Sequence, residues 1–531
     1  MTAPVITPYR PGQQAARDGF AQLLRAEWTK FRTVRGWVIG MVVAALVTVV
    51  FGLLVAEGGS TTCQASPASP VESGAACLPH IPLGPGGEAV TDSFYFLRQP
   101  LDGNGSITVR VSSLTGRYST GGIAAGPDPE ANFASGVQPW SKAGIIIKAA
   151  AKPGSAYAAM MVTGGHGVRM QDDYTHDTAG LPGAVSAASP RWLRLTRSGD
   201  TLTGYDSADG IHWTRVGTAH LAGLPATVQA GLFAASPDHQ TVVSQSLGGG
   251  TSTGGPSLAT AVFDHASLSG TRPGGGWRGG TVGGSPGGLP ASVSGFRHAS
   301  GGFTVTGTGD ISPAVGKGIG QYLAGAFAGL IAVVVVAVMF ITAEYRRGLI
   351  RVTLAASPRR GRVLAAKAIV AGAVPFVAGL AAAAAVVLLA SPLARAKGNY
   401  VLPVTSLTEL RVIAGTAAVL AVAAVLAVAI GTMLRRSAAA VTAGIVVIIL
   451  PYILGTAGVL PVGAADWLLR VTPAAAFAIQ QGAPRYPQVI ASYTPTAGYF
   501  PLAPWAGFAV LGGYAALALV LAVYLLRRRD A

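Results

Sequence analysis

Six hydrophobic runs constrain the fold of this 531-residue chain more than any other feature. Each run is about 20 residues or longer, the length at which an α-helix crosses the hydrocarbon core of a bilayer. The runs are Trp37–Ala56, Ile319–Ala343, Ala368–Leu389, Val412–Leu434, Ala438–Leu460 and Pro501–Leu526. Only 11% of the residues are charged, whereas a soluble domain carries about 25%. The chain is therefore a membrane protein with six predicted transmembrane helices rather than one soluble globule.

The positive charge of the chain lies beside these runs. The formal net charge is +16, yet residues 57–317 hold 15 basic and 16 acidic residues. The excess falls mainly in four basic clusters, at residues 1–36, 344–367, 435–436 and 527–529. With six spans these clusters share one side of the membrane, which the positive-inside rule identifies as the cytoplasm. We expect both termini in the cytoplasm, the segment 57–317 outside, and no nucleic-acid partner.

The six runs contain no Asp, Glu, Lys, Arg or His in their interiors, and all eight histidines lie within 57–317. Ionisable residues inside a membrane are costly and usually mark an ion or proton pathway. Their absence from the runs argues against an ion-coupled carrier and against an intramembrane enzyme.

The stretch 17–35, ahead of the first run, predicts an amphipathic helix. Five apolar side chains recur at helical spacing, and basic residues occupy the rest of the surface; the apolar set is Phe20, Leu23, Leu24, Trp28 and Phe31. Such a helix lies in the headgroup plane of a membrane. Two roles remain open, a plain membrane anchor and a surface that binds a partner.

Residues 343–368, AEYRRGLIRVTLAASPRRGRVLAAKA, form the most distinctive stretch of the chain. Arginines flank Pro358, which breaks a helix because it lacks a backbone N–H. The stretch also holds Leu349, Ile350, Val352 and Leu354, which a purely solvated loop does not need. A short amphipathic helix that docks on a partner accounts for both the charges and the apolar side chains.

Four segments resemble the membrane subunits of type-2 ABC transporters from high-GC bacteria. They are LLRAEWTKFRTVRGW, EYRRGLIRVTLAASPRRGRVLAAK, RVTPAAAFAIQQ and PWAGFAVLGGYAALALVLAVYLLRRRDA. The resemblance covers residues 17–56 and 318–531 and lies in the order of its parts. It implies an exporter subunit in a bacterial cell membrane, paired with a second copy or a homologous permease. The chain departs from the family pattern in its large insertion between the first two spans.

In that family the N-terminal amphipathic helix and the first cytoplasmic loop meet the ATPase subunit. Carried over to this sequence, the resemblance implicates the following residues in that contact: Glu27, Trp28, Lys30, Phe31, Glu344, Arg346, Arg347, Arg351, Pro358, Arg359 and Arg360. The chain lacks a P-loop, GxxxxGK[ST], whose amides and lysine hold phosphates. ATP and Mg²⁺ are therefore expected on a separate ATPase subunit, and no cofactor is expected on this chain.

The inserted segment begins with residues 57–90, which are rich in Ser, Pro and Gly and hold the only two cysteines, Cys63 and Cys77. An oxidising exterior favours a disulfide between them, and two free thiols are the alternative. From 91 to 270, short apolar alternations separated by Gly, Asp and Pro predict an antiparallel sandwich. The Gly-rich residues 271–317 predict a flexible linker.

Phrases such as WSKAGIIIKAAAKPGSAYAAMMVT and RWLRLTRSGDTLTGYDSADGIHWTRVG resemble the concanavalin-A-like lectin/glucanase superfold. The resemblance implies a jelly-roll sandwich and says little about function. Candidate ligand-binding residues are Trp140, Asp172, Asp173, Asp177 and Trp213. At strand positions tryptophans more often belong to the core, and an aspartate group of this kind more often belongs to a solvated loop. No carboxylate pair suited to glycoside cleavage stands out, so neither catalysis nor a metal site is expected, and glycan binding is left open.

The sequence thus predicts a multi-domain fold, with an α-helical membrane domain of six transmembrane helices and an all-β sandwich inserted between helices 1 and 2. The predicted parts are the leader 1–36, helix 1 at 37–56, the linker 57–90, the sandwich 91–270, the linker 271–317 and the helices of 318–531 with a coupling loop at 344–367. The predicted function is that of an ABC exporter permease with a non-catalytic external module. The alternative is a membrane-anchored glycan-binding or sensor protein, which leaves five spans unexplained.

Overall fold

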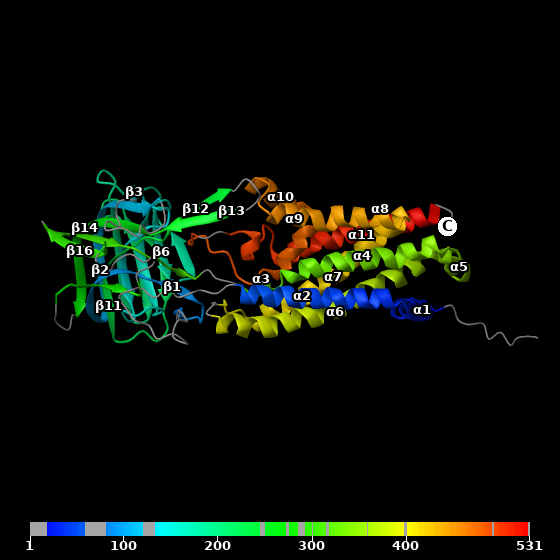
Figure 1. The fold of residues 1–531 in the computed structure, drawn as a ribbon. Coiled ribbons are helices and arrows are strands. Elements are labelled where there is room, and N and C mark those ends of the chain that lie inside the picture. The colour runs from blue at the N-terminus through cyan, green and yellow to red at the C-terminus, as the bar shows by residue number, and fades with distance from the viewer. Residues whose placement is uncertain are drawn as a thin grey trace, which may run out of the picture.

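The computed structural model describes most of the chain. The described residues are 19–58, 81–120, 133–244, 250–271, 276–284, 293–299, 301–314, 318–357, 359–397, 401–490 and 493–528. Cys63, Cys77 and Pro358 lie outside them. The described chain forms an elongated helix bundle with a β domain at one end (Figure 1). The β domain consists of the described residues of 81–314, and the bundle consists of those of 19–58 and 318–528.

The bundle contains both long and short helices. They are α1 (Phe20–Thr33), α2 (Arg35–Glu57), α3 (Ile319–Tyr322), α4 (Gly325–Arg346), α5 (Leu349–Ala356), α6 (Arg360–Ala396), α7 (Ser406–Leu434), α8 (Ser437–Gly444), α9 (Leu450–Thr456), α10 (Val462–Val471) and α11 (Pro504–Arg528). A π-helical turn, η3 (Ile445–Ile449), joins α8 to α9, and two 3₁₀ segments, η4 (Pro473–Gln480) and η5 (Pro495–Ala497), precede α11. Among the described residues, α2, α4, α6, α7, the α8–α9 stretch and α11 are long and apolar enough to cross a membrane.

Three of these helices begin more than one turn away from the start of the predicted run. Helix α7 begins at Ser406 rather than at Val412. The run 319–343 is divided, because α3 ends at Tyr322 and α4 begins at Gly325. Helix α6 begins at Arg360 rather than at Ala368, because the amphipathic turn before the apolar run is itself helical. Helix α6 therefore carries an ionisable residue, Lys367, that the predicted run excluded.

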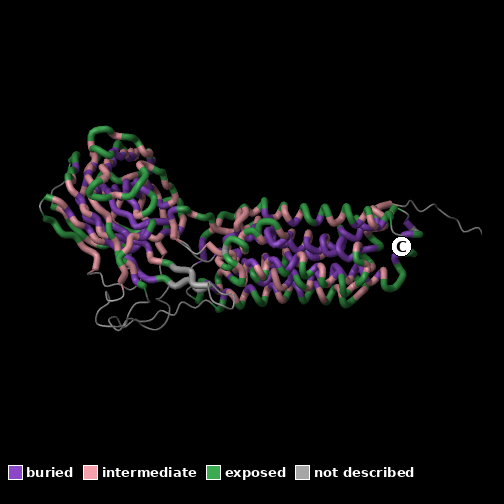
Figure 2. Tube along the Cα trace, turned by 90° about the horizontal axis from the view of Figure 1, so that it is seen from above, coloured by how far each residue is buried: buried purple, intermediate pink, exposed green. Residues whose placement is uncertain are grey.

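Close packing of small residues builds the centre of the bundle. Buried residues lie along the centre of the bundle and exposed ones along its outside (Figure 2). Helix α7 is the most buried of the candidate spans and α4 the next, whereas α2 and α11 are the least buried. Where α2 crosses α4, the position of a Cβ on Gly325 would be 2.4 Å from the carbonyl oxygen of Thr48. Glycines at such crossings let two backbones approach, which is how helices associate in an apolar solvent.

Antiparallel strands build the β domain. They are β1 (Val90–Asp92), β2 (Phe94–Ser119), β3 (Phe133–Ser135), β4 (Lys142–Lys148), β5 (Tyr157–Thr163), β6 (Val168–Asp172), β7 (His176–Ala179), β8 (Arg191–Ser198), β9 (Thr201–Ser207), β10 (Thr214–His220), β11 (Thr227–Ala235), β12 (His239–Ser244), β13 (Gly250–Gly255), β14 (Ser257–Thr271), β15 (Arg278–Val282), β16 (Gly295–Ala299), β17 (Gly302–Gly307) and β18 (Ile311–Pro313). The main sheet runs β10-β9-β8-β2-β11-β4-β5-β6-β7, and β14 to β17 join it through β2 and one another.

The Gly-rich segment 271–317 differs from the linker that its composition predicts. Strands β15, β16, β17 and β18 lie within it. Glycine serves close approach here, since a Cβ on Gly279 of β15 would collide with the hydroxyl of Tyr95 and with the ring of Phe296. A Gly-rich composition therefore marks crowded strand pairing at this position as well as loops.

The central strands of the β domain are buried on both faces. On β4, Ile145 and Ile147 belong to one apolar core, while Ile146 belongs to a second core on the opposite face. Strand residues alternate between faces, so Lys142 and Lys148 share the face of Ile146. Both lysine side chains are fully buried.

These two lysines hold the segments where the chain enters and leaves the β domain. Lys148 Nζ donates to Asp92 Oδ2, at the end of β1, over 2.7 Å. Lys142 Nζ donates to Asp310 Oδ1, just before β18, over 2.6 Å. Strands β1 and β18 pair with each other, Thr91 opposite Ser312. The two ends of the domain are therefore adjacent, which lets a domain be inserted between two helices without separating them.

We predict that Asp92→Ala destabilises the β domain, because it leaves Lys148 buried without its carboxylate. Breaking such a pair from one side costs about 3–5 kcal/mol. Thermal unfolding of the purified full chain, followed by tryptophan fluorescence, should show an earlier β-domain transition. The matched variant Asp102→Ala, which removes a carboxylate bonded only to the exposed Thr227 hydroxyl in the described structure, should change it little. Equal midpoints for the two variants would contradict the structural role of the Lys148 pair.

Candidate functional site

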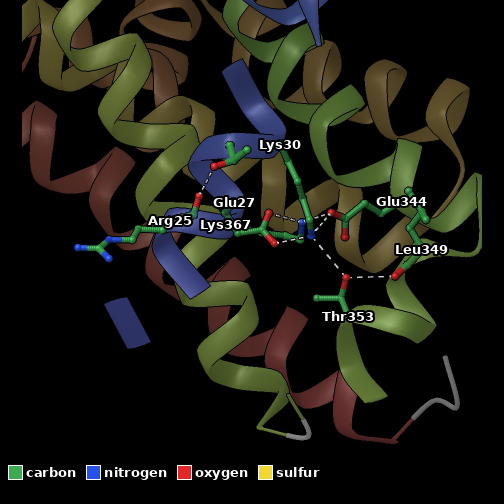
Figure 3. A network of polar contacts seen from close by, with 8 residues as sticks. Arg25, Glu27, Lys30, Glu344, Leu349, Thr353 and Lys367 are labelled. Atoms are coloured by element: carbon green, nitrogen blue, oxygen red, sulfur yellow. Dashed lines mark hydrogen bonds and ion pairs between the residues drawn. The ribbon is translucent and has the colours of Figure 1, made fainter. Parts of the chain in front are cut away.

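A buried group of charged side chains lies at the bundle end that is remote from the β domain (Figure 3). Lys367 of α6 donates to Glu27 Oε2 at 2.6 Å and to Glu344 Oε1 at 2.5 Å. Lys30 of α1 donates to Glu27 Oε1 at 2.8 Å, to Glu344 Oε1 at 3.0 Å and to Thr353 Oγ1 at 3.4 Å. We call Glu27, Lys30, Glu344 and Lys367 the charge cluster. It joins α1, α4 and α6 directly and α5 through Thr353.

The charge cluster carries no net charge, and three of its four side chains are shielded from solvent, whereas the side chain of Lys30 is 36% exposed. The relative exposures of Glu27, Glu344 and Lys367 are 1%, 4% and 0%. Burial disfavours the charged form of Lys30, but hydrogen bonds and charges from Glu27 and Glu344 outweigh it and raise the pKa of Lys30. Lys367 also lies over the ring of Phe340, 5.0 Å from its centroid. Two glutamates and two lysines thus neutralise one another at a place where isolated charges would be costly.

Helix α1 is docked on the bundle through this cluster and through aromatic packing. Phe31 is buried, and its ring packs edge-on against Phe340, with centroids 5.6 Å apart. Trp28, placed on the same apolar face by its sequence spacing, is 49% exposed instead. The apolar face is divided because Glu27, not Trp28, turns toward α6 to meet Lys367. Helix α1 therefore contacts protein on one side and leaves Trp28 on the outer side.

Helix α5 forms a short arm between α4 and α6. It begins after Gly348, whose positive φ of 69° is a backbone conformation suited to glycine. Ile350 and Leu354 pack on Val363 of α6, with Leu23 of α1 against the same cluster. On the opposite side Val352 is 69% exposed. The stretch thus contains the short amphipathic helix that its pattern predicts.

The predicted arginines do not join the charge cluster. Arg346, Arg347, Arg351 and Arg359 are exposed around α5 and the start of α6. Arg360 turns toward α11 and donates to the carbonyl oxygen of Leu526 at 2.5 Å. Pro358 lies outside the described residues.

The structure therefore brings together Glu27, Lys30 and Glu344 and adds two residues that sequence reasoning missed. Lys367 was counted as one cation of a loop, and Thr353 carried no signal. The clue to Lys367 was its position between alanines, in the run VLAAKAIVAGA, where a helix begun at Arg360 places a charge two turns deep.

In the β domain the candidate ligand residues bond to different partners. Trp140 is only 6% exposed and stacks on His166 with ring centroids 4.0 Å apart. Trp213 is covered by Arg194, whose guanidinium carbon is 3.9 Å from the ring centroid. These contacts occupy the faces that a sugar ring would need.

The three aspartates also point to separate partners. Asp172 pairs with His176 at 3.1 Å, Asp173 accepts from the backbone N–H of Tyr157, and Asp177 pairs with Arg169. Burial raises the pKa of Asp172 and of Asp173. Within the described residues, no group of three or more His, Cys, Asp or Glu is arranged to hold a metal ion.

A family model described as ABC-2 family transporter protein matches residues 160–531, which is more than half of the chain. The chain belongs to the ABC-2 transporter family. It is therefore a multi-pass permease of an ABC transporter, and permeases of this family are in general non-enzymatic membrane subunits that work with an ABC ATPase. The matched residues run from β5 through the last helix, so they include part of the β domain as well as α3 to α11.

No curated protein matches this permease closely enough to count as a relative. Three solved structures are similar to part of the chain. A functionally unknown protein from Saccharomyces cerevisiae is 19% identical over 34% of this chain and 76% of its own, with a TM-score of 0.20. A member of the eqolisin family of peptidases bound to a tripeptide is 5% identical over 42% and 100%, with a TM-score of 0.23. Scytalido-glutamic peptidase with a transition-state analogue inhibitor is 7% identical over 42% and 100%, with a TM-score of 0.24. With TM-scores this low, the three matches support no conclusion about the fold or the role of the β domain.

We predict that Lys367→Met destabilises the permease by about 3 kcal/mol, because it leaves Glu27 and Glu344 buried with Lys30 as their one remaining lysine. The midpoint of thermal unfolding in detergent should fall. Arg362→Met, an exposed change on the same helix, is the control and should leave the midpoint close to wild type. Because the residues touch, the double variant Lys367→Met/Glu344→Gln should lose less than the two single losses added. Strict additivity would mean that the cluster is not an energetic unit.

Proposed function

We propose that this permease is the membrane subunit of an exporter, in which a separate ATPase subunit docks on α1, α5 and the arginines around α5. The observation that carries the proposal is the charge cluster, which ties these elements to α4 and α6. Of the six candidate spans, α4 and α6 are the two that flank α5 in the chain. A force applied to α5 therefore reaches two membrane helices at once.

The surface of α5 has the chemistry of a protein-docking site. Val352 is 69% exposed and Leu349 47% exposed, and exposed Arg346, Arg347 and Arg351 surround them. Apolar anchors with a basic rim suit a partner that offers an apolar groove edged by acidic residues. Trp28, exposed on α1, extends the same end of the bundle.

The inner face of α5 explains how docking of the ATPase subunit would be transmitted to the membrane helices. Ile350 and Leu354 pack on Val363, and Thr353 accepts from Lys30 at 3.4 Å. Because apolar contacts hold α5 on one side and the charge cluster holds it on another, α5 would move as a rigid unit and not as a flexible loop. The partner subunit would bind ATP and Mg²⁺, and this chain would supply helix α5, which transmits the movement, and the transport pathway.

We further propose the bacterial cell membrane as the location, with both termini in the cytoplasm and the β domain outside. The basic residues of the remote bundle end support this orientation by the positive-inside rule. Two permeases, identical or homologous, would form the pathway, and the direction of transport is inferred from the family. Apolar spans favour a lipid-like or amphipathic cargo.

For the β domain we propose a non-catalytic binding or structural module of the jelly-roll type, and for the linker that precedes it a Cys63–Cys77 disulfide. Gln488, in the segment between η4 and α11, donates to the carbonyl oxygens of Tyr174 and Thr175 at 3.4 Å. This contact favours a structural role at the outer mouth of the bundle over the alternative of a glycan sensor on a membrane anchor.

The charge-reversed triple variant Arg346→Glu/Arg347→Glu/Arg351→Glu tests the docking surface. We predict that the ATPase subunit co-purifying with the tagged permease falls roughly tenfold, a loss of about 1.4 kcal/mol in association. The matched control reverses three exposed cations at the other end of the bundle, Arg395→Glu/Lys397→Glu/Arg470→Glu, and should keep the ATPase. Undiminished ATPase in the first variant, with unfolding midpoints alike, would place the docking surface elsewhere.

A further inference from the structure

A pocket of about 590 Å³ lies between the first turn of α6 and the last turn of α11. Its lining consists of Arg359, Arg360, Gly361, Arg362 and Arg527, and we call it the arginine pocket. Four guanidinium groups and no carboxylate contribute to this lining among the described residues. Like charges gathered around one hollow repel one another, so the pocket is built to hold an anion.

One of the four arginines has a structural task. Arg360 Nη1 donates to the carbonyl oxygen of Leu526 at 2.5 Å and to that of Arg527 at 3.5 Å. These bonds satisfy carbonyl groups in the last turn of α11 and hold α11 against α6. Arg359, Arg362 and Arg527 are exposed around the hollow. Three arginines that are free of this task therefore line the gap between the two helices.

Gly361 leaves the room in which an anion would sit. A Cβ built on Gly361 would touch only Val523 Cγ1 at 3.8 Å and Arg527 Nη2 at 3.9 Å. The nearest atoms are thus one apolar side chain and one guanidinium of α11. A small anion bound here would meet Arg527 on one side and the backbone at the start of α6 on the other.

The flanks of the arginine pocket are apolar. Ile369, about two turns further along α6 than Gly361, is 49% exposed. Val520, one turn before Val523 on α11, is 68% exposed. Tyr524 is 46% exposed, with Arg528 above its ring at 4.7 Å, the pairing of aromatic and basic residues found at membrane interfaces. A cationic hollow thus opens above an apolar strip formed by two candidate membrane spans.

We propose that the arginine pocket binds the phosphate group of an anionic membrane phospholipid, with an acyl chain along Ile369 and Val520. A water-soluble phosphate would match the arginines but leave the apolar strip unused. A zwitterionic headgroup would bring an ammonium group toward four guanidiniums, which repel it. Basic pockets between membrane helices have this chemistry in general. The proposal does not use Arg346, Arg347 or Arg351 of the ATPase docking surface, and it reassigns Arg359, counted above among the arginines around α5, to lipid.

The test is native mass spectrometry of the full-length permease in detergent, titrated with phosphatidylglycerol or with phosphatidylcholine. Wild type should retain phosphatidylglycerol and release phosphatidylcholine. The double variant Arg362→Gln/Arg527→Gln should bind phosphatidylglycerol roughly tenfold more weakly. Gly361→Leu keeps every charge but places a bulky apolar side chain in the hollow beside Arg527, and it should weaken lipid binding as well. The matched control, Arg25→Gln/Arg436→Gln, removes two exposed arginines outside the pocket and should bind as wild type does.

Three results would overturn the proposal. Equal retention of phosphatidylglycerol by wild type and Gly361→Leu would show that the lipid binds by surface charge alone. Displacement of the lipid by equimolar inorganic phosphate would identify a soluble phosphate as the occupant. Loss of the co-purifying ATPase in Gly361→Leu, with lipid binding unchanged, would assign the pocket to the protein interface. If the double arginine variant fails to fold, Gly361→Leu still decides the question, because a Cβ fits there without collision.

Discussion

Three buried charges, those of Glu27, Glu344 and Lys367, and the partly exposed charge of Lys30 organise the remote end of this permease. Glu27 and Lys367 are 340 positions apart in the chain, yet their side chains meet at 2.6 Å. A buried carboxylate or ammonium group costs several kcal/mol unless it is paired, so α1, α4 and α6 must stay together for any one of these charges to be tolerated. Helix α5 is added to the same group through Thr353. The charge cluster therefore holds α1, α4, α5 and α6 together as one body, although their sequences alone would allow these helices to move apart.

The β domain uses the same physical constraint for a different purpose. Lys148 and Lys142, at the two ends of β4, are buried and pair with Asp92 and Asp310 at the incoming and outgoing ends of the domain. Tyr174 reinforces the first pair, since its hydroxyl donates to Asp92 Oδ2 at 2.6 Å. These ion pairs therefore hold the two ends of the β domain together on the side where the chain returns to the bundle. The insertion of the domain leaves the packing of α2 against α4 intact.

Sequence periodicity predicted much of this architecture and missed its polar contacts for a definable reason. Hydropathy located the long helices because their length is set by bilayer thickness, and alternation located strands such as β5, Tyr157–Thr163. Pairing between distant residues has no local signature, so the partners of Glu27 and Lys148 could not be read from spacing. Glycine misled the assignment of 271–317, because the same residue permits both flexible loops and crowded strands. Resemblance pointed to Glu27, Lys30 and Glu344 but could not separate them from exposed Trp28 or from Arg360, which turns toward α11.

The most direct test of the central claim, that the end built around the charge cluster receives the ATPase, is a photo-crosslink in native membranes. A photoreactive amino acid at Val352, 69% exposed on α5, should capture a polypeptide with an ATP-binding site on irradiation. The same probe at Leu407, 80% exposed at the other end of the bundle, should not capture it. Capture of the ATPase from Leu407, or a Val352 probe that captures only proteins without an ATP site, would contradict the account.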